Sequence, residues 1–403
     1  MLVLPLIALL AQLIGAPIDE LPLTPAGCLI VSPNLDALVT CLDTFTVPHD
    51  YYSQLTYAVA QPMPAQRVAF SDAVRTLLSV DGDCATKQVS SALVGLYAFA
   101  PFRGHCVLFE TSSNCGTYAK GWGFAIVPAR ASGVQRMLHV SAPHPAYDLG
   151  TVEQAAAVYE GSGGRSLLVA GRKRTAFLAS SGCVKGAPRR AYYMTDPAHN
   201  DQEPFFDASA ALYAWQHAQP DGCVPGACAF LQLHGKGAAT CPNDAVFISA
   251  GLSNSTVALP LYTTPMHPPA RLAAALSTAF PSAKISTPAT SRCALTATQN
   301  VVGRASNGVP PSSVCAQPAR VRDVDGTWLH AEQSSAMRER GAYAAWVEAV
   351  KAAVAPVAVD VPREELGEGS GGGEVRVLVD AEHRVAPAAW SAWLLFAHYF
   401  ALR

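Results

Sequence analysis

Charged residues are scarce in this sequence. Asp, Glu, Lys and Arg together make up 14% of the 403 residues, and the net charge is −2. A chain with so little charge lacks the basic surface that nucleic acids and anionic membranes attract, so we expect neither as a partner. Half of the residues are hydrophobic, which argues against disorder and suits a well-buried globular enzyme of one large or two smaller domains.

Several catalytic motifs are also missing from the sequence. Without a Gly-x-Ser-x-Gly elbow, a serine esterase is disfavoured. There is neither a phosphate-binding Gly-x-x-x-x-Gly-Lys-Ser/Thr loop nor a dinucleotide fingerprint. No repeat of about 20–50 residues occurs, which argues against solenoids and propellers. None of the 11 cysteines shows Cys-x-x-Cys spacing, so a zinc ribbon is disfavoured as well.

The cysteines and the N-terminus point to export. Residues 1–16 are almost wholly apolar and end in small residues, which is typical of a secretory signal peptide; a buried N-terminal strand is the alternative. In an oxidising compartment, five disulfides and one free thiol would account for the cysteines, but their pairing cannot be read from the sequence. Asn254 begins a glycosylation sequon, so the expected product is a secreted, disulfide-bonded glycoprotein.

The C-terminal region differs in composition from the rest. Residues 359–374 form a charged and then glycine-rich linker, and residues 375–403 form an apolar tail. Its last part, 386–402, is near the lower limit for a membrane span and also resembles a glycolipid-anchor signal. A buried terminal strand and helix are the alternative. We expect a membrane partner, and surface anchoring, only if the tail is an anchor signal; residues 17–358 are expected to form a single α/β domain.

The order of the apolar runs predicts an α/β fold. Residues 17–135 contain short apolar runs between Gly, Pro and Cys, which predicts a strand-rich N-terminal part. Beyond it, strands and helices alternate, so we expect a mostly parallel or mixed sheet. The predicted strands are 137–142, 165–170, 227–233, 245–250 and 328–331, and the predicted helices are 152–159, 269–280 and 335–354. Thr151 is the expected N-cap of the first of these helices, with Gln154 completing a capping box.

Potential metal ligands follow these predicted strands. His144 and Asp148 lie in the turn after 137–142, and His234 ends the strand 227–233. Because sites in such sheets form at the carboxyl ends of strands, we expect these side chains to meet. Zinc bound by three such ligands with one open position lowers the pKa of its water towards about 7. Glu332, just after another strand, is placed to take the proton of that water.

Each of these residues also has a purely structural explanation. A Pro-His-Pro turn is commonly a packing feature, and Asp148 can support the start of a helix through the helix dipole. His234 can be a hydrogen-bonded core histidine, and Glu332 can pair with Arg338 on the helix that follows. It is their joint position at strand ends of one sheet that favours a metal site.

Other polar residues are candidates for substrate contacts. His199 lies in a loop, where it can be a metal ligand, a substrate contact or a structural cap. Arg174 belongs to a basic cluster that can hold a substrate carboxylate, since the arginine fork matches a carboxylate; a solvated loop or a processing site are alternatives. Asn300 and Arg304 can bind an anion in a turn.

The segments around these residues resemble exported microbial proteins of poorly defined function. More distantly, they resemble the poly-γ-glutamate hydrolases and N-formylglutamate amidohydrolases, which have a zinc-carboxypeptidase-like fold and cleave amide bonds with one zinc. The resemblance covers roughly residues 135–355. It rests on the segments 144–151, 165–171 with Arg174, 196–200, 232–235 and 330–332. A three-layer αβα domain is the fold that it implies.

The resemblance also implies roles for single residues. His144, Asp148 and His234 would bind Zn²⁺, and Glu332 would be the catalytic general base. The family usually carries Glu as its acid ligand at another spacing, so His199 is an alternative ligand to Asp148. The expected function is that of a secreted zinc-dependent hydrolase of peptide or glutamyl-like amides. The alternative is a non-catalytic secreted or surface-anchored binding protein that retains the fold.

Overall fold

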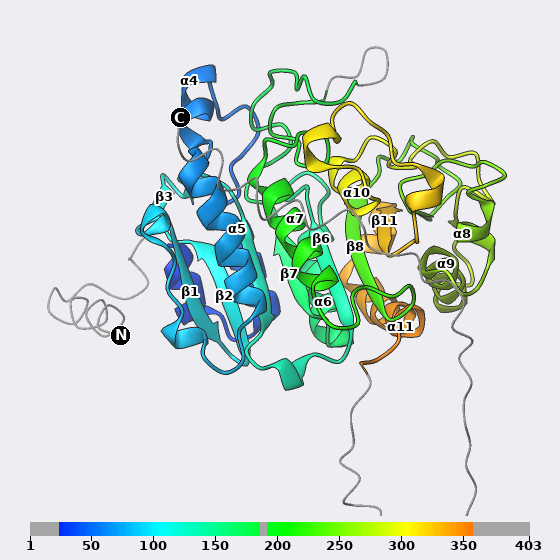
Figure 1. The fold of residues 1–403 in the computed structure, drawn as a ribbon, viewed down its shortest axis with the longest axis horizontal. Coiled ribbons are helices and arrows are strands. Elements are labelled where there is room, and N and C mark those ends of the chain that lie inside the picture. The colour runs from blue at the N-terminus through cyan, green and yellow to red at the C-terminus, as the bar shows by residue number, and fades with distance from the viewer. Residues whose placement is uncertain (1–23, 186–191, 358–403) are drawn as a thin grey trace, which may run out of the picture. The chain divides into compact units, whose positions relative to one another are not determined.

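A single mixed sheet of nine strands organises the structure, a computed structural model that describes residues 24–185 and 192–357. Figure 1 shows the sheet and its surrounding helices. From one edge to the other, the strands are β1 (Tyr97–Phe102), β2 (His105–Glu110), β5 (Phe124–Pro128), β7 (Ser166–Val169), β6 (Met137–Ala142), β8 (Cys228–Gly235), β11 (Trp328–Gln333), β9 (Val246–Ser249) and β10 (Ile285–Ser286). Two further strands, β3 (Ser113–Asn114) and β4 (Thr117–Tyr118), form a separate hairpin. The predicted α/β class is confirmed.

The middle of the sheet is parallel. The strands β7, β6, β8 and β11 pair in parallel with one another, in this order, so the carboxyl ends of these four strands lie along one edge. β5 pairs with β7 antiparallel, and β2 and β1 continue in the same way. At the other side, β9 is antiparallel to β11 and parallel to β10. The sheet is therefore mixed, with a parallel centre that can gather strand-end residues into one place.

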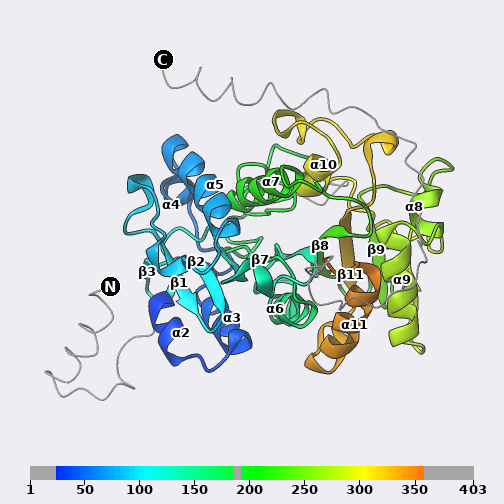
Figure 2. The ribbon, with the colours of Figure 1, turned by 60° about the horizontal axis from the view of Figure 1, so that its bottom comes forward.

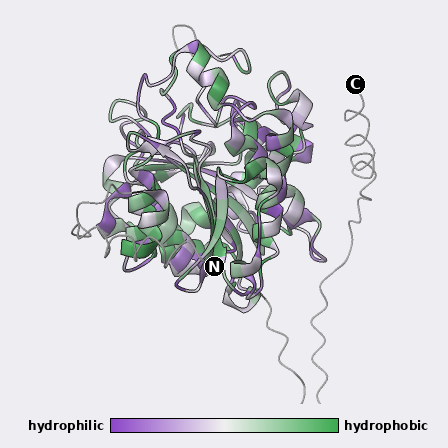
Figure 3. Ribbon diagram, turned by 90° about the vertical axis from the view of Figure 1, so that its left-hand side faces the viewer, coloured by the Kyte–Doolittle hydropathy of each residue, from purple (hydrophilic) through white to green (hydrophobic). Residues whose placement is uncertain are grey.

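Helices cover both faces of the sheet (Figure 2). One layer contains α2 (Pro25–Val31), α3 (Leu35–Asp43), α6 (Thr151–Ser162), α9 (Pro268–Ala279) and α11 (Tyr343–Ala353). The other layer contains α5 (Pro64–Leu78), α7 (Pro204–His217) and α10 (Val301–Ser306). The remaining α-helices of the described residues are α4 (Gln54–Ala60) and α8 (Leu259–Thr263). β5, β7 and β9 are buried along their whole length, as expected of strands covered on both faces. Figure 3 shows hydrophobic residues concentrated on the central strands.

The N-terminal prediction was wrong in part. A strand-rich part was expected at 17–135, but the described residues of this part begin with four helices, α2 to α5. Short apolar runs do not separate strands from helices by periodicity alone. The helical starts are marked instead by side-chain caps at Thr24, Asn34 and Ser53. The strands that do occur in this part, β1, β2 and β5, extend the central sheet.

Two predictions about helices also need correction. The helix expected at 335–354 is broken into two short 3-10 turns, Ser335–Arg338 and Arg340–Ala342, followed by α11. Glu339, between the two turns, has extended backbone (ψ 149°). At α6, the N-cap is Gly150, which has no side chain to cap the helix. Thr151 is the first helical residue, and its hydroxyl donates to the Asp148 carbonyl. The predicted capping box is therefore absent.

Five disulfides confirm the expected number. They join Cys28–Cys41, Cys84–Cys106, Cys183–Cys315, Cys223–Cys228 and Cys241–Cys293. Cys115 is free and exposed. So many disulfides are typical of an extracellular protein.

Other predictions concern the ends of the chain. Among the described residues, none of the helices has the length and hydrophobicity that crossing a membrane requires. The described residues belong to one compact unit that ends at Val357. The predicted signal peptide (1–16), linker (359–374) and tail (375–403) lie outside the described residues. Asn254, in the predicted sequon, is exposed.

Candidate metal centre

The candidate site lies at the carboxyl edge of the parallel strands. β6 ends at Ala142, and His144 and Asp148 follow it in the turn that leads to α6. His234 is the penultimate residue of β8, the neighbour of β6 in the sheet. All three side chains are buried, with exposed fractions of 1%, 4% and 3%. The sheet thus brings together His144 and His234, which are 90 residues apart in the sequence.

Three ligand-type atoms converge at this place. His144 Nδ1 lies 3.0 Å from Asp148 Oδ2, His234 Nδ1 lies 3.1 Å from His144 Nδ1, and His234 Nδ1 lies 3.4 Å from Asp148 Oδ2. Ligands at about 2.0–2.1 Å around a tetrahedral cation are about 3.3 Å apart. The triangle formed by the three atoms therefore has the size of one face of such a coordination shell.

The outer nitrogen of His144 is also hydrogen-bonded. Nε2 lies 3.0 Å from Asp196 Oδ1, and the other carboxylate oxygen of Asp196 pairs with Arg174. Burial would raise the pKa of Asp196, but Arg174, His199 and His144 hold it well below its usual range. Asp196 is therefore an acceptor and Nε2 of His144 carries a proton, so Nδ1 is the ring nitrogen that could bind a cation. The sequence reading missed Asp196, although it lies only three residues before His199.

The pKa values of the cluster show how strongly these groups interact. Burial and Arg174 act to lower the pKa of His144, but Asp148 and Asp196 outweigh them and raise it. Burial would raise the pKa of Asp148, but His144 and His234 lower it far below its usual range. Burial lowers the pKa of His234 to about 4, against the hydrogen bond to Asp148. A positive charge among these groups is thus strongly favoured, and either a proton or a bound cation would supply it.

A second set of potential ligands adjoins the first. His330 and Glu332 lie on β11, where Glu332 is in register with His234. Their ligand atoms and that of His234 lie within 4.8 Å of one another, and His330 Nε2 is 3.6 Å from Glu332 Oε1. His330 is buried, and its Nδ1 has no hydrogen-bond partner. The sequence reading did not select His330, although the two-residue period of a strand places it on the same face as Glu332.

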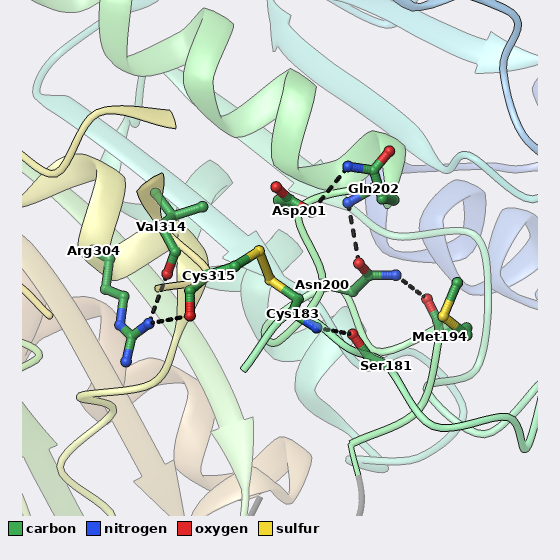
Figure 4. The surroundings of a disulfide bond; sticks show 9 residues. All are labelled: Ser181, Cys183, Met194, Asn200, Asp201, Gln202, Arg304, Val314 and Cys315. Atoms are coloured by element: carbon green, nitrogen blue, oxygen red, sulfur yellow. Dashed lines mark hydrogen bonds between the residues drawn. A yellow bond between two sulfur atoms is a disulfide. The ribbon is translucent and has the colours of Figure 1, made fainter. Parts of the chain in front are cut away.

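Two other groups of potential ligands do not suit a metal. Each contains one Asp and two cysteines: Cys183, Cys315 and Asp201 in one group, and Cys241, Cys293 and Asp244 in the other. All four cysteines are in disulfides (Figure 4 shows the first pair), so they offer no thiolate. Among the described residues, the strand-end histidines therefore remain as the candidate metal centre.

A cavity of about 300 Å³ opens onto these residues. His144, Asp148, His234, His330 and Glu332 all contribute to its wall. Its volume is at the low end of the range for small-molecule sites, which is about 300–1,000 Å³. The site therefore has room for a small ligand next to the ligand-type atoms.

Arg174 and His199 lie in the same cavity wall but outside the cluster. His199 Nδ1 is 3.1 Å from Asp196 Oδ2, and the ring stacks on Tyr192 with centroids 3.6 Å apart. Arg174 pairs with Asp196 and lies over the ring of Tyr147. Asp148, and not His199, thus lies with His144 and His234. The place of His199 on the cavity wall suits the alternative role as a substrate contact.

The structure separates Asn300 from Arg304. Asn300 caps α10 and lies in the cavity wall. The guanidinium of Arg304 donates to the carbonyls of Thr298, Val314 and Cys315, and Arg304 is not among the residues that line the cavity. Figure 4 shows it next to the Cys183–Cys315 disulfide. The structure therefore does not bring Arg304 to the site, and its hydrogen bonds give it a structural role.

The backbone around the cavity is strained at two alanines. Ala146, in the turn between His144 and Asp148, has φ 54°, and Ala297, in the cavity wall, has φ 56°. Both lie in the left-handed region, which costs roughly 1–3 kcal/mol for residues other than glycine and is found preferentially at functional sites. The strain supports a functional role for this edge of the sheet.

Comparison with known proteins leaves the family open. No family model matches the sequence, and no curated protein matches it. The resemblance to amidohydrolases therefore stays a prediction.

Proposed function

We propose that the protein is a secreted, zinc-dependent hydrolase of amide bonds with a zinc-carboxypeptidase-like fold. The observation that carries the proposal is the convergence of His144 Nδ1, His234 Nδ1 and Asp148 Oδ2 within 3.0–3.4 Å at the floor of a cavity. Two imidazole nitrogens and one carboxylate oxygen are a ligand set of catalytic zinc sites, where a fourth position stays open. A bound zinc ion would polarise the amide carbonyl and acidify a water molecule.

Glu332 is the group of this chain best placed to move protons. It lies in the cavity wall, in register with His234 on the neighbouring strand. As the general base it would take a proton from the attacking water and later deliver it to the leaving nitrogen. His330, buried beside it, would limit the positions that the Glu332 carboxylate can take.

The remaining wall of the cavity suits a small polar substrate. Arg174 brings a guanidinium to the wall, held in place by Asp196 and Tyr147. A guanidinium matches a carboxylate, so a peptide or glutamyl-like amide with a free carboxylate is the proposed substrate class. His199 and Asn300 provide further polar groups on the same wall.

Metal content tests the proposal directly. Purified protein should contain about one zinc per chain, and His144→Ala or His234→Ala should abolish stoichiometric binding. His105→Ala is the matched control, because His105 lies on β2, in the antiparallel part of the sheet. If the wild type contains no stoichiometric metal and the two site variants do not differ from it, the proposal is wrong.

Hydrolysis separates the enzyme from its alternative. Release of amine from short peptides and γ-glutamyl amides should depend on the bound metal and disappear in both site variants. One metal per chain without hydrolysis of any compound in such a panel would instead favour a non-catalytic secreted binding protein that keeps the metal site.

A further inference from the structure

Whether Nδ1 of His234 can bind a metal depends on which of its two ring nitrogens carries the proton. The sequence does not reveal this. We propose that Gln232 and Asn300 are positioning residues that keep the His234 proton on Nε2, so that Nδ1 is free to bind a metal. This inference rests on the proposed function, because it treats His234 as a metal ligand. It concerns neutral side chains, whose hydrogen bonds can be followed from donor to acceptor.

The chain of hydrogen bonds begins at a donor of known identity. The main-chain N–H of Gly303 donates to Asn300 Oδ1 over 3.0 Å, as expected of an Asn that caps a helix. This bond fixes which end of the Asn300 amide is oxygen. The other end, Nδ2, must then be the donor in the 2.6 Å contact with Gln232.

The same logic continues to the imidazole. Because Asn300 Nδ2 donates, the atom of Gln232 that receives the bond must be the carbonyl oxygen Oε1. This oxygen also lies 2.8 Å from His234 Nε2. An amide oxygen can only accept, so Nε2 carries the proton and Nδ1 of the neutral ring bears a lone pair. The main-chain N–H of Gly303 thereby determines the tautomer of His234, through Asn300 and Gln232.

Gln232 gives up a hydrogen bond in this arrangement. Its Nε2 is buried and has no hydrogen-bond partner, and Gln232 itself is 1% exposed. A buried donor without a partner destabilises the folded protein. Asn300 Nδ2 fixes this orientation, and the single oxygen Oε1 then serves both Asn300 and His234.

The two metal-facing histidines are thus held by different chemistry. His144 is oriented by the ionised carboxylate of Asp196, and His234 by the neutral amide of Gln232. Outer partners of this kind fix the ring orientation of metal-binding histidines, and their loss typically weakens metal binding roughly 10–100-fold. Asn300→Asp and Gln232→Glu each add one negative charge, so the comparison of these two variants separates the tautomer from charge.

Asn300→Asp is the sharpest test. Asp caps helices as well as Asn, so α10 should keep its start. The new carboxylate would face Gln232 Oε1, and the Gln232 amide would turn to donate to it. His234 Nε2 would then face a donor, and its proton would move to Nδ1. Zinc affinity should fall roughly 10–100-fold, and nitrogen NMR of metal-free, histidine-labelled protein should show His234 with the opposite tautomer.

Gln232→Glu is the matched variant. A carboxylate there accepts from both Asn300 Nδ2 and His234 Nε2 and removes the unpartnered amide nitrogen. The His234 tautomer should therefore stay as in the wild type, and zinc should bind at least as tightly.

The outcomes separate this inference from the proposed function. If Asn300→Asp folds but keeps the wild-type tautomer and zinc affinity, or if Gln232→Glu weakens zinc as much as Asn300→Asp does, the inference is wrong while the function can stand. If the wild type binds no metal but the tautomer moves as described, the positioning role is upheld and the proposed function fails.

Discussion

At the scale of single residues, the site depends on which atom each histidine turns inward. His144 and His234 both present Nδ1 to Asp148. The Nε2 of His144 is held by Asp196 from another segment, and that of His234 by Gln232 on the same strand. Three acceptors at 3.0–3.4 Å repel one another unless a positive charge lies between them. The unoccupied protein would carry a proton there, and a metal ion would compete with that proton.

The role of Glu332 leads to the first prediction. If Glu332 is the general base, Glu332→Gln should lower turnover of an amide substrate by roughly 10²–10⁴-fold and leave the zinc content unchanged. Glu339→Gln, at an exposed position seven residues later, should have no effect on either. Loss of metal from Glu332→Gln would show that Glu332 is a ligand instead, and wild-type turnover would exclude both roles.

A second prediction concerns His139, which is buried outside the metal cluster. Its ring is hydrogen-bonded to Ser166 and Gln216, and burial lowers its pKa to about 3. Below the pKa of about 6.5 that histidine has in the unfolded chain, His139 is protonated in the unfolded state but stays neutral in the folded state. His139 should therefore remove stability as the pH falls from about 6.5 towards 3, by about 1.4 kcal/mol per pH unit.

The measurement is the free energy of unfolding in urea at several pH values in this window. His139→Phe keeps an aromatic ring against Phe230, on which His139 stacks. The variant should be less stable overall. Its free energy of unfolding should depend less steeply on pH, by about one proton taken up on unfolding. Parallel curves for the two proteins would show that the pKa of His139 is not depressed.

The sequence predicted the proposed metal ligands better than the residues that orient them. His144, Asp148 and His234 stand out because each lies at or just beyond the carboxyl end of an apolar strand. Asp196 and Gln232 act by orienting other side chains, and only a three-dimensional contact reveals such a role. The turn signal at residues 300–304 suggested anion binding, but the Arg304 guanidinium lies on main-chain carbonyls instead.

At the scale of elements, the turn between β6 and α6 is the most constrained part of the site. Ala146 has a left-handed backbone, and Gly150 has φ 86°. A Cβ on Gly150 would lie 2.6 Å from the carbonyl oxygen of Arg338. The turn that carries His144 and Asp148 is thus fitted closely against the segment after β11.

The third prediction follows from this fit. Gly150→Ala should destabilise the protein by about 1–3 kcal/mol, because both the positive φ and the contact with Arg338 oppose a methyl group. It should also weaken zinc binding by displacing Asp148. Gly341→Ala is the control, since that position has open space around it and a compatible Ala stabilises by about 0.4–1 kcal/mol. Denaturant unfolding of the two variants should show shifts of opposite sign; equal shifts would contradict the account.

Elements of the parallel centre were easier to predict than those around it. The central strands are rich in apolar residues and largely buried, and β6 has the predicted bounds. The break before α11 was not visible, because its cause is tertiary. The carbonyl of Met337 accepts hydrogen bonds from Gln154 and Trp346, which draws the chain away from a continuous helix.

At the scale of the whole molecule, disulfides hold the walls of the cavity. Cys241–Cys293 joins two segments whose adjacent residues, Thr240 and Ala294, line the cavity. Cys183–Cys315 joins the segment before Tyr192 to the loop after α10. The strand ends place the proposed metal ligands, and these two crosslinks restrain the loops around the cavity.

The fourth prediction compares disulfides of different span. Cys183–Cys315 closes a separation of 132 residues, and Cys223–Cys228 closes one of 5. In the chain-entropy model, removing the first should lower the free energy of unfolding by about 4–5 kcal/mol, and removing the second by about 2 kcal/mol. Paired Cys→Ala variants, unfolded in urea, give both values. A larger loss for the short crosslink would show that local geometry, and not chain entropy, dominates.

The inward Nδ1 atoms have one more consequence, for the choice of metal. The Nδ1 of histidine is as many bonds from Cα as the side-chain oxygen of asparagine. His144→Asn and His234→Asn would therefore exchange two nitrogen donors for two oxygens at nearly the same places. An all-oxygen set beside Asp148 favours hard ions such as Mn²⁺ or Mg²⁺ over zinc. A competition experiment between Zn²⁺ and Mn²⁺ on the double variant would show whether these two substitutions are enough to change the preferred ion while the fold stays the same.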